Sequence, residues 1–169
     1  MRGFGPRGLI VHGANPARLA ALLADLGMGQ DGIATLACGA EPSLPMLETA
    51  LVQARAHKPD WVLGLGGGSV MDLAKALAGL IPAKAGPMDH LEVVGRGLPL
   101  TEAPLPFIAI PTTAGTGAEA TKNARICGSS GAKPCSPFRA CFGNGWRRSC
   151  RRQPVSDWQT MGATRGLRP

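Results

Sequence analysis

Short apolar runs alternate with longer segments of helical periodicity along most of the chain. Gly8–His12 is an apolar run that stops at Gly13, and it predicts a buried strand. Asn15 then suits a helix cap, and Pro16 suits the first helical position because that position needs no amide hydrogen. Leucines recur at helical spacing as far as Gly27, which predicts a helix that ends in a left-handed glycine cap.

The same alternation continues downstream. Further strands are expected at Ile33–Cys38, Trp61–Leu65 and Phe107–Ile110, and further helices from Leu44 to near His57 and from Val70 to shortly before Pro82. Residues 82–106 are rich in Pro and Gly, which favours a long surface loop. Strands that alternate with amphipathic helices indicate an α/β fold with a parallel sheet and helices on both faces.

Sheets of this kind bind ligands beyond the carboxyl ends of their strands, so the loops at those ends are the candidate ligand-binding segments. The glycine turn, residues 64–69, joins the third strand to the third helix with the sequence Gly-Leu-Gly-Gly-Gly-Ser. Glycines let an anion approach the backbone, and the start of a helix presents free amides and a partial positive charge. The Ser69 hydroxyl can add a donor or cap the helix. A tight strand-to-helix connection explains this turn equally well, and the missing Gly-Lys-Ser/Thr excludes a P-loop.

The threonine loop, residues 111–119, leaves the fourth strand at the same edge of the sheet. It carries three hydroxyls, on Thr112, Thr113 and Thr116, which can bind ribose and the carboxamide of nicotinamide. Taken alone, this loop is explained more simply as a solvated Ser/Thr/Gly segment. The threonine loop therefore indicates a binding site only in combination with the glycine turn.

Together, Gly66-Gly67-Gly68-Ser69-Val70-Met71-Asp72-Leu73-Ala74-Lys75 and the later Pro111-Thr112-Thr113-Ala114-Gly115-Thr116-Gly117-Ala118-Glu119-Ala120-Thr121 resemble the iron-containing alcohol dehydrogenase family. The order, spacing and strand context of the two segments match that family over about residues 8–124. The resemblance implies a Rossmann-like domain that binds NAD or NADP. It implies cofactor contacts from Gly66, Gly67, Gly68, Ser69, Asp72, Thr112, Thr113 and Thr116, with the pyrophosphate at Gly67–Ser69.

Two positions leave alternatives open. Asp72 is equally well explained as an acid in the first helical turn, where a negative charge suits the helix dipole. Lys75 is more simply solvated or ion-paired than catalytic. The residues after the first strand, Gly13–Asn15, lack the Asp with which many NAD-preferring relatives bind ribose. Glu41 is an alternative ribose partner, and it is equally well explained as an ordinary loop acid. We therefore leave the choice between NAD and NADP open.

The resemblance also implies chemistry for which this chain lacks residues. Members of the family transfer a hydride between an alcohol or carbonyl and NAD(P), and an Asp and three His of a helical C-terminal domain bind iron or zinc. This chain has only His12, His57 and His90, on separate predicted elements, so we predict no metal site, no catalytic residue and no such C-terminal domain. We expect an N-terminal fragment that is inactive alone.

The balance of basic and acidic residues changes near residue 125. Overall, 18 Lys/Arg and 11 Asp/Glu give a net charge of +7, but nine of the basic residues and one acid lie in 125–169. Four of the 5 cysteines lie there too, without Cys-x-x-Cys spacing. We therefore predict a dinucleotide-binding domain over 1–124 and a disordered, basic, Cys/Arg-rich tail over 125–169. A reading-frame change near codon 125 is our hypothesis for the origin of the tail, and a genuine translated sequence is the alternative.

Other functions remain as alternatives. The domain could be a non-catalytic nucleotide-binding remnant, and Arg147–Arg152 with Trp146 and Trp158 could bind nucleic acid, although charged runs are usually just solvated. No apolar run is long enough to span a membrane, and no secretory signal is present, so we expect a cytoplasmic protein. Relatives are often homo-oligomers. The sequence identifies neither the alcohol or carbonyl substrate nor the oligomeric state.

Overall fold

Four parallel strands form the central sheet of the protein. The computed structural model describes residues 4–27, 31–128 and 136–139. In spatial order the strands are β2 (Ile33–Ala37), β1 (Gly8–His12), β3 (Trp61–Gly66) and β4 (Phe107–Pro111). All three neighbouring pairs are parallel, which confirms the parallel sheet expected from the alternating pattern.

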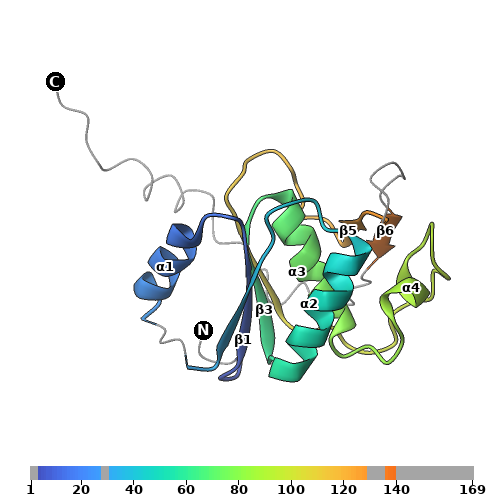
Figure 1. The fold of residues 1–169 in the computed structure, drawn as a ribbon, viewed down its shortest axis with the longest axis horizontal. Coiled ribbons are helices and arrows are strands. Elements are labelled where there is room, and N and C mark those ends of the chain that lie inside the picture. The colour runs from blue at the N-terminus through green and yellow to red at the C-terminus, as the bar shows by residue number, and fades with distance from the viewer. Residues whose placement is uncertain (1–3, 28–30, 129–135, 140–169) are drawn as a thin grey trace.

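Helices cover both faces of this sheet (Figure 1). α2 (Leu44–His57) and α3 (Gly68–Leu80) pack on one face, where they share a core with the β1 side chains of Leu9 and Val11. α1 (Pro16–Asp25) lies on the other face, and its leucines pack around Ile10 and Leu63. The α/β architecture with helices on both faces is confirmed.

Local signals place the helix ends where the sequence predicts them. The Asn15 side chain accepts a hydrogen bond from the Ala17 amide at 3.0 Å and caps α1. Gly27 follows α1 with a φ of +59°, which is the left-handed conformation that glycine adopts at no steric cost. At the end of α3, the guanidinium of Arg55 donates to the carbonyl of Leu80, the last residue of the helix, and to the carbonyls of Ile81 and Ala83 just beyond it.

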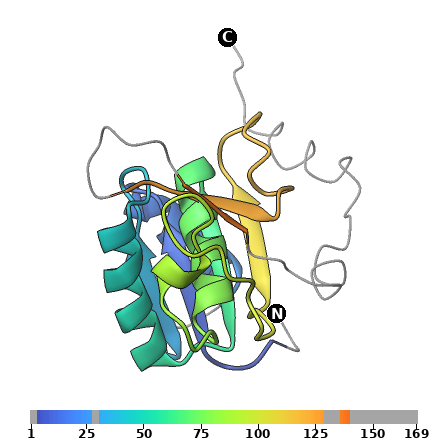
Figure 2. The same ribbon diagram turned by 90° about the vertical axis from the view of Figure 1, so that its right-hand side faces the viewer.

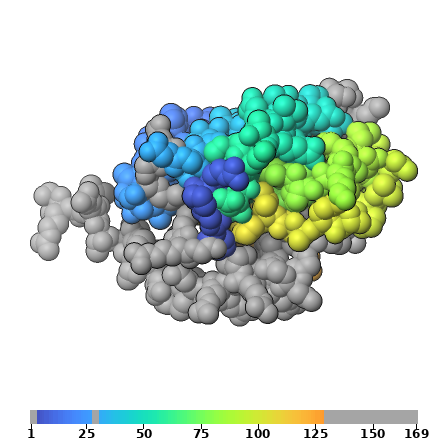
Figure 3. All heavy atoms as spheres, turned by 90° about the horizontal axis from the view of Figure 1, so that it is seen from below, coloured from blue at the N-terminus to red at the C-terminus, as the bar shows by residue number. Residues whose placement is uncertain are grey.

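The strand order decides where a ligand binds. The chain steps outward from β1 to β2, and then returns to the other side of β1 for β3 and β4. The loops after β1 and β3 therefore lead to opposite faces, and a crevice opens between them at the carboxyl ends of the strands. The opposite end of the molecule, with the turns that enter the strands, faces the viewer in Figure 3.

The segment after the threonine loop differs from the prediction. β5 (Asn123–Ile126) pairs with β6 (Ser136–Arg139) in an antiparallel ladder, and Ala124 and Ile126 are buried in the core. The Cys127 backbone bonds to Pro42 and Leu44, at 2.8 and 2.9 Å. The expected domain boundary at residue 124 thus falls inside a packed strand. Most of the predicted tail, residues 129–135 and 140–169, lies outside the described residues.

The predicted surface loop over 82–106 contains one short helix, α4 (Pro87–His90). It projects beside α2 in Figure 1. Within the described part of the chain, none of the helices combines the length and apolar character that crossing a lipid bilayer requires.

Candidate functional site

The glycine turn connects β3 to α3 through backbone that a side chain would obstruct. A β-carbon on Gly66 would lie 2.5 Å from Val70 Cγ2, so a larger residue would displace the first turn of α3. Gly67 is the N-cap and supplies no side-chain acceptor to the helix. The first amides of α3 therefore point out of the helix without an intrahelical partner, and they can bind an anion.

The threonine loop lies directly against the glycine turn. The Thr112 amide donates to the Gly66 carbonyl at 2.9 Å. A β-carbon built on Gly67 would lie 3.1 Å from Thr113 Oγ1, and one on Gly68 would lie 3.8 Å from Thr116 Cγ2. The two segments, which are far apart in the sequence, therefore share one rim of the molecule.

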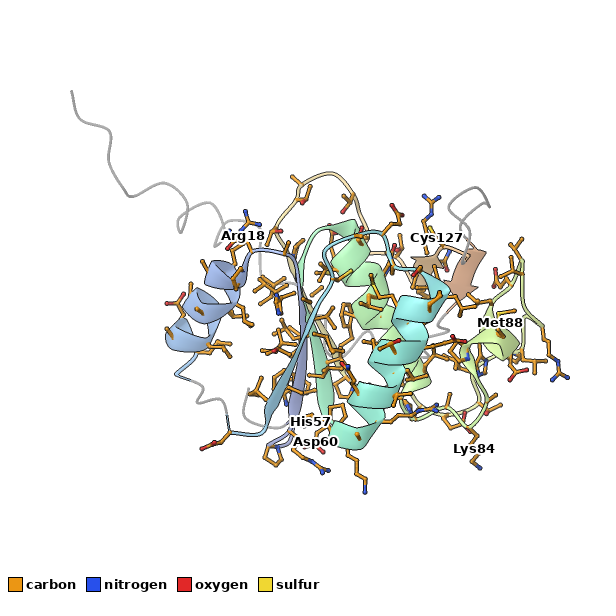
Figure 4. All side chains as sticks on the ribbon, viewed as in Figure 1. Arg18, His57, Asp60, Lys84, Met88 and Cys127 are labelled. Carbon is orange, nitrogen blue, oxygen red and sulfur yellow. The ribbon has the colours of Figure 1, made fainter. Side chains whose placement is uncertain are left out.

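A cleft of about 400 Å³ opens at this rim, between the carboxyl ends of β1 and β3. Its walls come from the loop after β1, the loop after β2 and the glycine turn. The predicted residues that line it are Gly66, Gly67, Gly68, Ser69 and Thr112. Arg18, which lies on α1 and is labelled in Figure 4, also lines the cleft. Glu41 lines it too, so that a cation and a carboxylate border the cleft.

A second cleft of about 710 Å³ adjoins the first along Glu41, Gly68 and Ser69, which line both. Asp72 and Thr116 complete the set of predicted residues in its wall. Arg125 also lines it, although the sequence pattern assigned that residue to the tail. Thr113 lines neither cleft, but it contacts the glycine turn from the loop side.

Asp72 and Ser69 differ from the roles expected at the helix start. α3 begins at Gly68 and has no acidic residue in its first turn, so the interpretation of Asp72 as a first-turn acid is wrong. Its carboxylate instead forms an ion pair of 3.0 Å with Lys75, which confirms that Lys75 is paired. Ser69 does not cap the helix, because the N-cap is Gly67.

The histidines do not converge. His12 contacts the Gly13 carbonyl at 2.7 Å, His57 contacts the Gly8 carbonyl at 3.1 Å, and His90 lies in α4. Across residues 4–27, 31–128 and 136–139, no group of three or more His, Cys, Asp or Glu side chains is placed to hold a metal ion. This part of the chain therefore does not fit the iron or zinc that the resemblance implies.

Cys38 directly follows β2, lines the first cleft and is buried. Its Sγ donates to the Ala40 carbonyl at 3.3 Å. Burial raises the pKa of the Cys38 thiol, which keeps this group protonated and weakly nucleophilic near neutral pH.

Comparison with known proteins identifies the family. A sequence profile described as "Iron-containing alcohol dehydrogenase" matches residues 1–136. The chain is 46% identical over 81 residues to long-chain-alcohol dehydrogenase 1 of Geobacillus thermodenitrificans, an alignment that covers 48% of this chain and 20% of that protein. It is 40% identical over 82 residues to the sulfoacetaldehyde reductase of Bilophila wadsworthia, with 48% and 20% covered.

Solved structures of iron-containing alcohol dehydrogenases share the fold of this chain. An iron-containing alcohol dehydrogenase from Thermotoga maritima superposes with a TM-score of 0.62 at 31% identity, over 80% of this chain and 38% of that chain. The fold also matches a sulfoacetaldehyde reductase from Bifidobacterium kashiwanohense in complex with NAD+, with a TM-score of 0.65, 23% identity and coverage of 79% and 35%.

The region that matches the family profile includes all four strands of the sheet and the helices that pack on it. The chain spans about a fifth of the length of the curated relatives it matches. The matched profile covers most of this chain and includes both the glycine turn and the threonine loop. The chain therefore belongs to the iron-containing alcohol dehydrogenase family.

Proposed function

We propose that the two adjoining clefts bind the dinucleotide NAD or NADP. The observation that carries this proposal is the shared rim, where the Thr112 amide bonds to Gly66 and Thr113 lies against Gly67. The chain would then supply the coenzyme-binding part of an oxidoreductase that interconverts a small alcohol and its carbonyl compound.

The chemistry of the rim favours a ligand with a diphosphate in its middle. The free amides at the start of α3 and the Ser69 hydroxyl would hold the diphosphate, because a helix N-terminus attracts anions. The clefts adjoin at Gly68 and Ser69, so each cleft can hold one of the two nucleoside ends of such a ligand. Thr112, Thr113 and Thr116 would offer hydroxyls to ribose and to the nicotinamide carboxamide, and Asp72 would border the second cleft.

The first cleft suits either coenzyme. A carboxylate such as Glu41 accepts hydrogen bonds from ribose hydroxyls, whereas the guanidinium of Arg18 is suited to the 2′-phosphate of NADP. The proposal therefore includes both coenzymes, and a titration with each decides between them.

When bound, the nicotinamide ring would accept or donate the hydride. The described residues would bind and orient the coenzyme, and no step is assigned to a metal because they offer no fitting ligand set. We expect coenzyme binding without turnover by this chain. The alcohol or carbonyl substrate, homo-oligomerisation and a cytoplasmic location stay predictions.

Calorimetric titration of the full chain tests the proposal. We expect saturable binding of NAD+ or NADP+, and competition by ADP-ribose, because ADP-ribose keeps the diphosphate. Nicotinamide mononucleotide lacks the diphosphate link and should bind much more weakly. No heat from either dinucleotide would refute the proposal. Alcohol-dependent reduction of the coenzyme, assayed with added Fe²⁺ or Zn²⁺, separates an active enzyme from a nucleotide-binding remnant.

A further inference from the structure

Lys75 is a buried charged side chain. It lies on α3 and is fully buried. Its Nζ forms the ion pair with Asp72 and donates hydrogen bonds to the Ala118 carbonyl at 2.9 Å, to Thr121 Oγ1 at 3.2 Å and to the Asn123 carbonyl. An ammonium group with this many oxygen partners is compensated for its removal from water.

The partners of Lys75 share a location. Ala118 lies near the end of the threonine loop, Thr121 follows the loop, and Asn123 is the first residue of β5. β5 lies beside α3 in Figures 1 and 2. The start of the threonine loop is held separately, through the bond between Thr112 and Gly66. Both ends of the loop are thus fastened to the unit formed by β3, the glycine turn and α3.

The stretch between these two attachments depends on them. Residues 113–116 are exposed, and Gly115 and Gly117 adopt left-handed backbone with φ values of +89° and +60°. A short exposed segment with two such glycines has considerable conformational freedom in the absence of its attachments. The position of this segment beside Gly67 and Gly68 therefore depends largely on the contacts at its two ends.

We infer that Lys75 is a positioning residue that holds the threonine loop against the glycine turn. Lys75 itself lines neither cleft, so its effect on a ligand acts through the loop. A loop already fixed in place loses less entropy when a ligand binds, which strengthens binding. The link to coenzyme affinity rests on the proposed function, whereas the link to loop order does not.

The test replaces Lys75 with methionine (Lys75→Met), which keeps most of the side-chain volume and removes the ammonium. Leu47→Ala is the matched control, because Leu47 is fully buried on α2 and lines neither cleft. Amide hydrogen exchange over 112–121 is measured without coenzyme, and coenzyme affinity is measured by titration. We expect Lys75→Met to speed exchange across the loop and to weaken coenzyme binding by about ten-fold. Leu47→Ala should change neither at a comparable loss of melting temperature.

If both variants show the same exchange and the same affinity, Lys75 has only a structural role and the inference is wrong. If Lys75→Met does not fold, Thr121→Val removes one acceptor of the ammonium at an exposed position, with Thr101→Val as its exposed control. Thr121→Val alone should then speed loop exchange, and equal exchange in the two variants would overturn the inference. A wild-type chain that binds no coenzyme would refute the proposed function, while loop exchange would still test Lys75.

Discussion

Replacing Gly68 with alanine should separate folding from ligand binding. Gly68 is the first residue of α3, and the nearest atom to an added β-carbon would be Thr116 Cγ2 at 3.8 Å, which is ordinary van der Waals contact. Its φ does not lie in the left-handed region, so alanine is not strained there. Alanine also favours helix over glycine by up to about 1 kcal/mol. The free energy of unfolding of Gly68→Ala should therefore stay equal or rise slightly.

Binding should respond in the opposite direction. Gly68 lines both clefts, so a methyl group there occupies space where an anion would approach the first amides of α3. Loss of one hydrogen bond to a charged group costs about 1.5–3 kcal/mol. This range corresponds to an affinity lowered by roughly ten- to a hundred-fold.

Thermal unfolding and calorimetric titration of the same preparations provide the assay. Gly86→Ala is the matched control: Gly86 is the N-cap of α4, it also tolerates a β-carbon, and it lies outside both clefts. Equal coenzyme affinity in the two variants would refute the assignment of the diphosphate to the glycine turn. A large loss of stability in Gly68→Ala would refute the packing argument.

Two further predictions concern stability. Arg55→Ala should lower the free energy of unfolding, measured in urea, by about 1.5–3 kcal/mol, because the carbonyls of Leu80 and Ala83 would lose a charged donor. Arg55→Lys should show an intermediate loss of stability. Unchanged stability in Arg55→Ala would contradict the capping role. Burial raises the pKa of the Cys38 thiol above its ordinary value of 9.0, so the folded state favours the neutral thiol. The free energy of unfolding should therefore decline as pH rises above 9.0 and through the raised pKa. Urea unfolding across that pH range should show a smaller decline in Cys38→Ala. The same pH dependence of stability in both proteins would contradict this prediction.

Much of the fold follows from the sequence because the strands are continuous apolar runs bounded by turn residues. β1 has the predicted bounds, and the Asn15 cap and the Gly27 stop flank α1 as expected. The rim was also predictable, since carboxyl ends of parallel strands meet at one edge.

The features that the sequence did not predict depend on distant contacts. α4 is too short for helical periodicity to register. β5 offers only Ala124 and Ile126 between charged and polar neighbours, and it becomes part of the core by packing beside α3. The burial of Lys75 requires acceptors on a segment far along the chain, so no local sequence pattern predicts it.

Amide chemical shifts give the most direct test of the shared rim as a dinucleotide site. Labelled protein is titrated with NAD+ and NADP+, and the shifts are mapped onto the sequence. The account predicts that the largest changes cluster at Gly67–Ser69 and Thr112–Thr116 and saturate together. Saturable shifts that lie elsewhere, or an unchanged spectrum at high concentrations of both coenzymes, would contradict it.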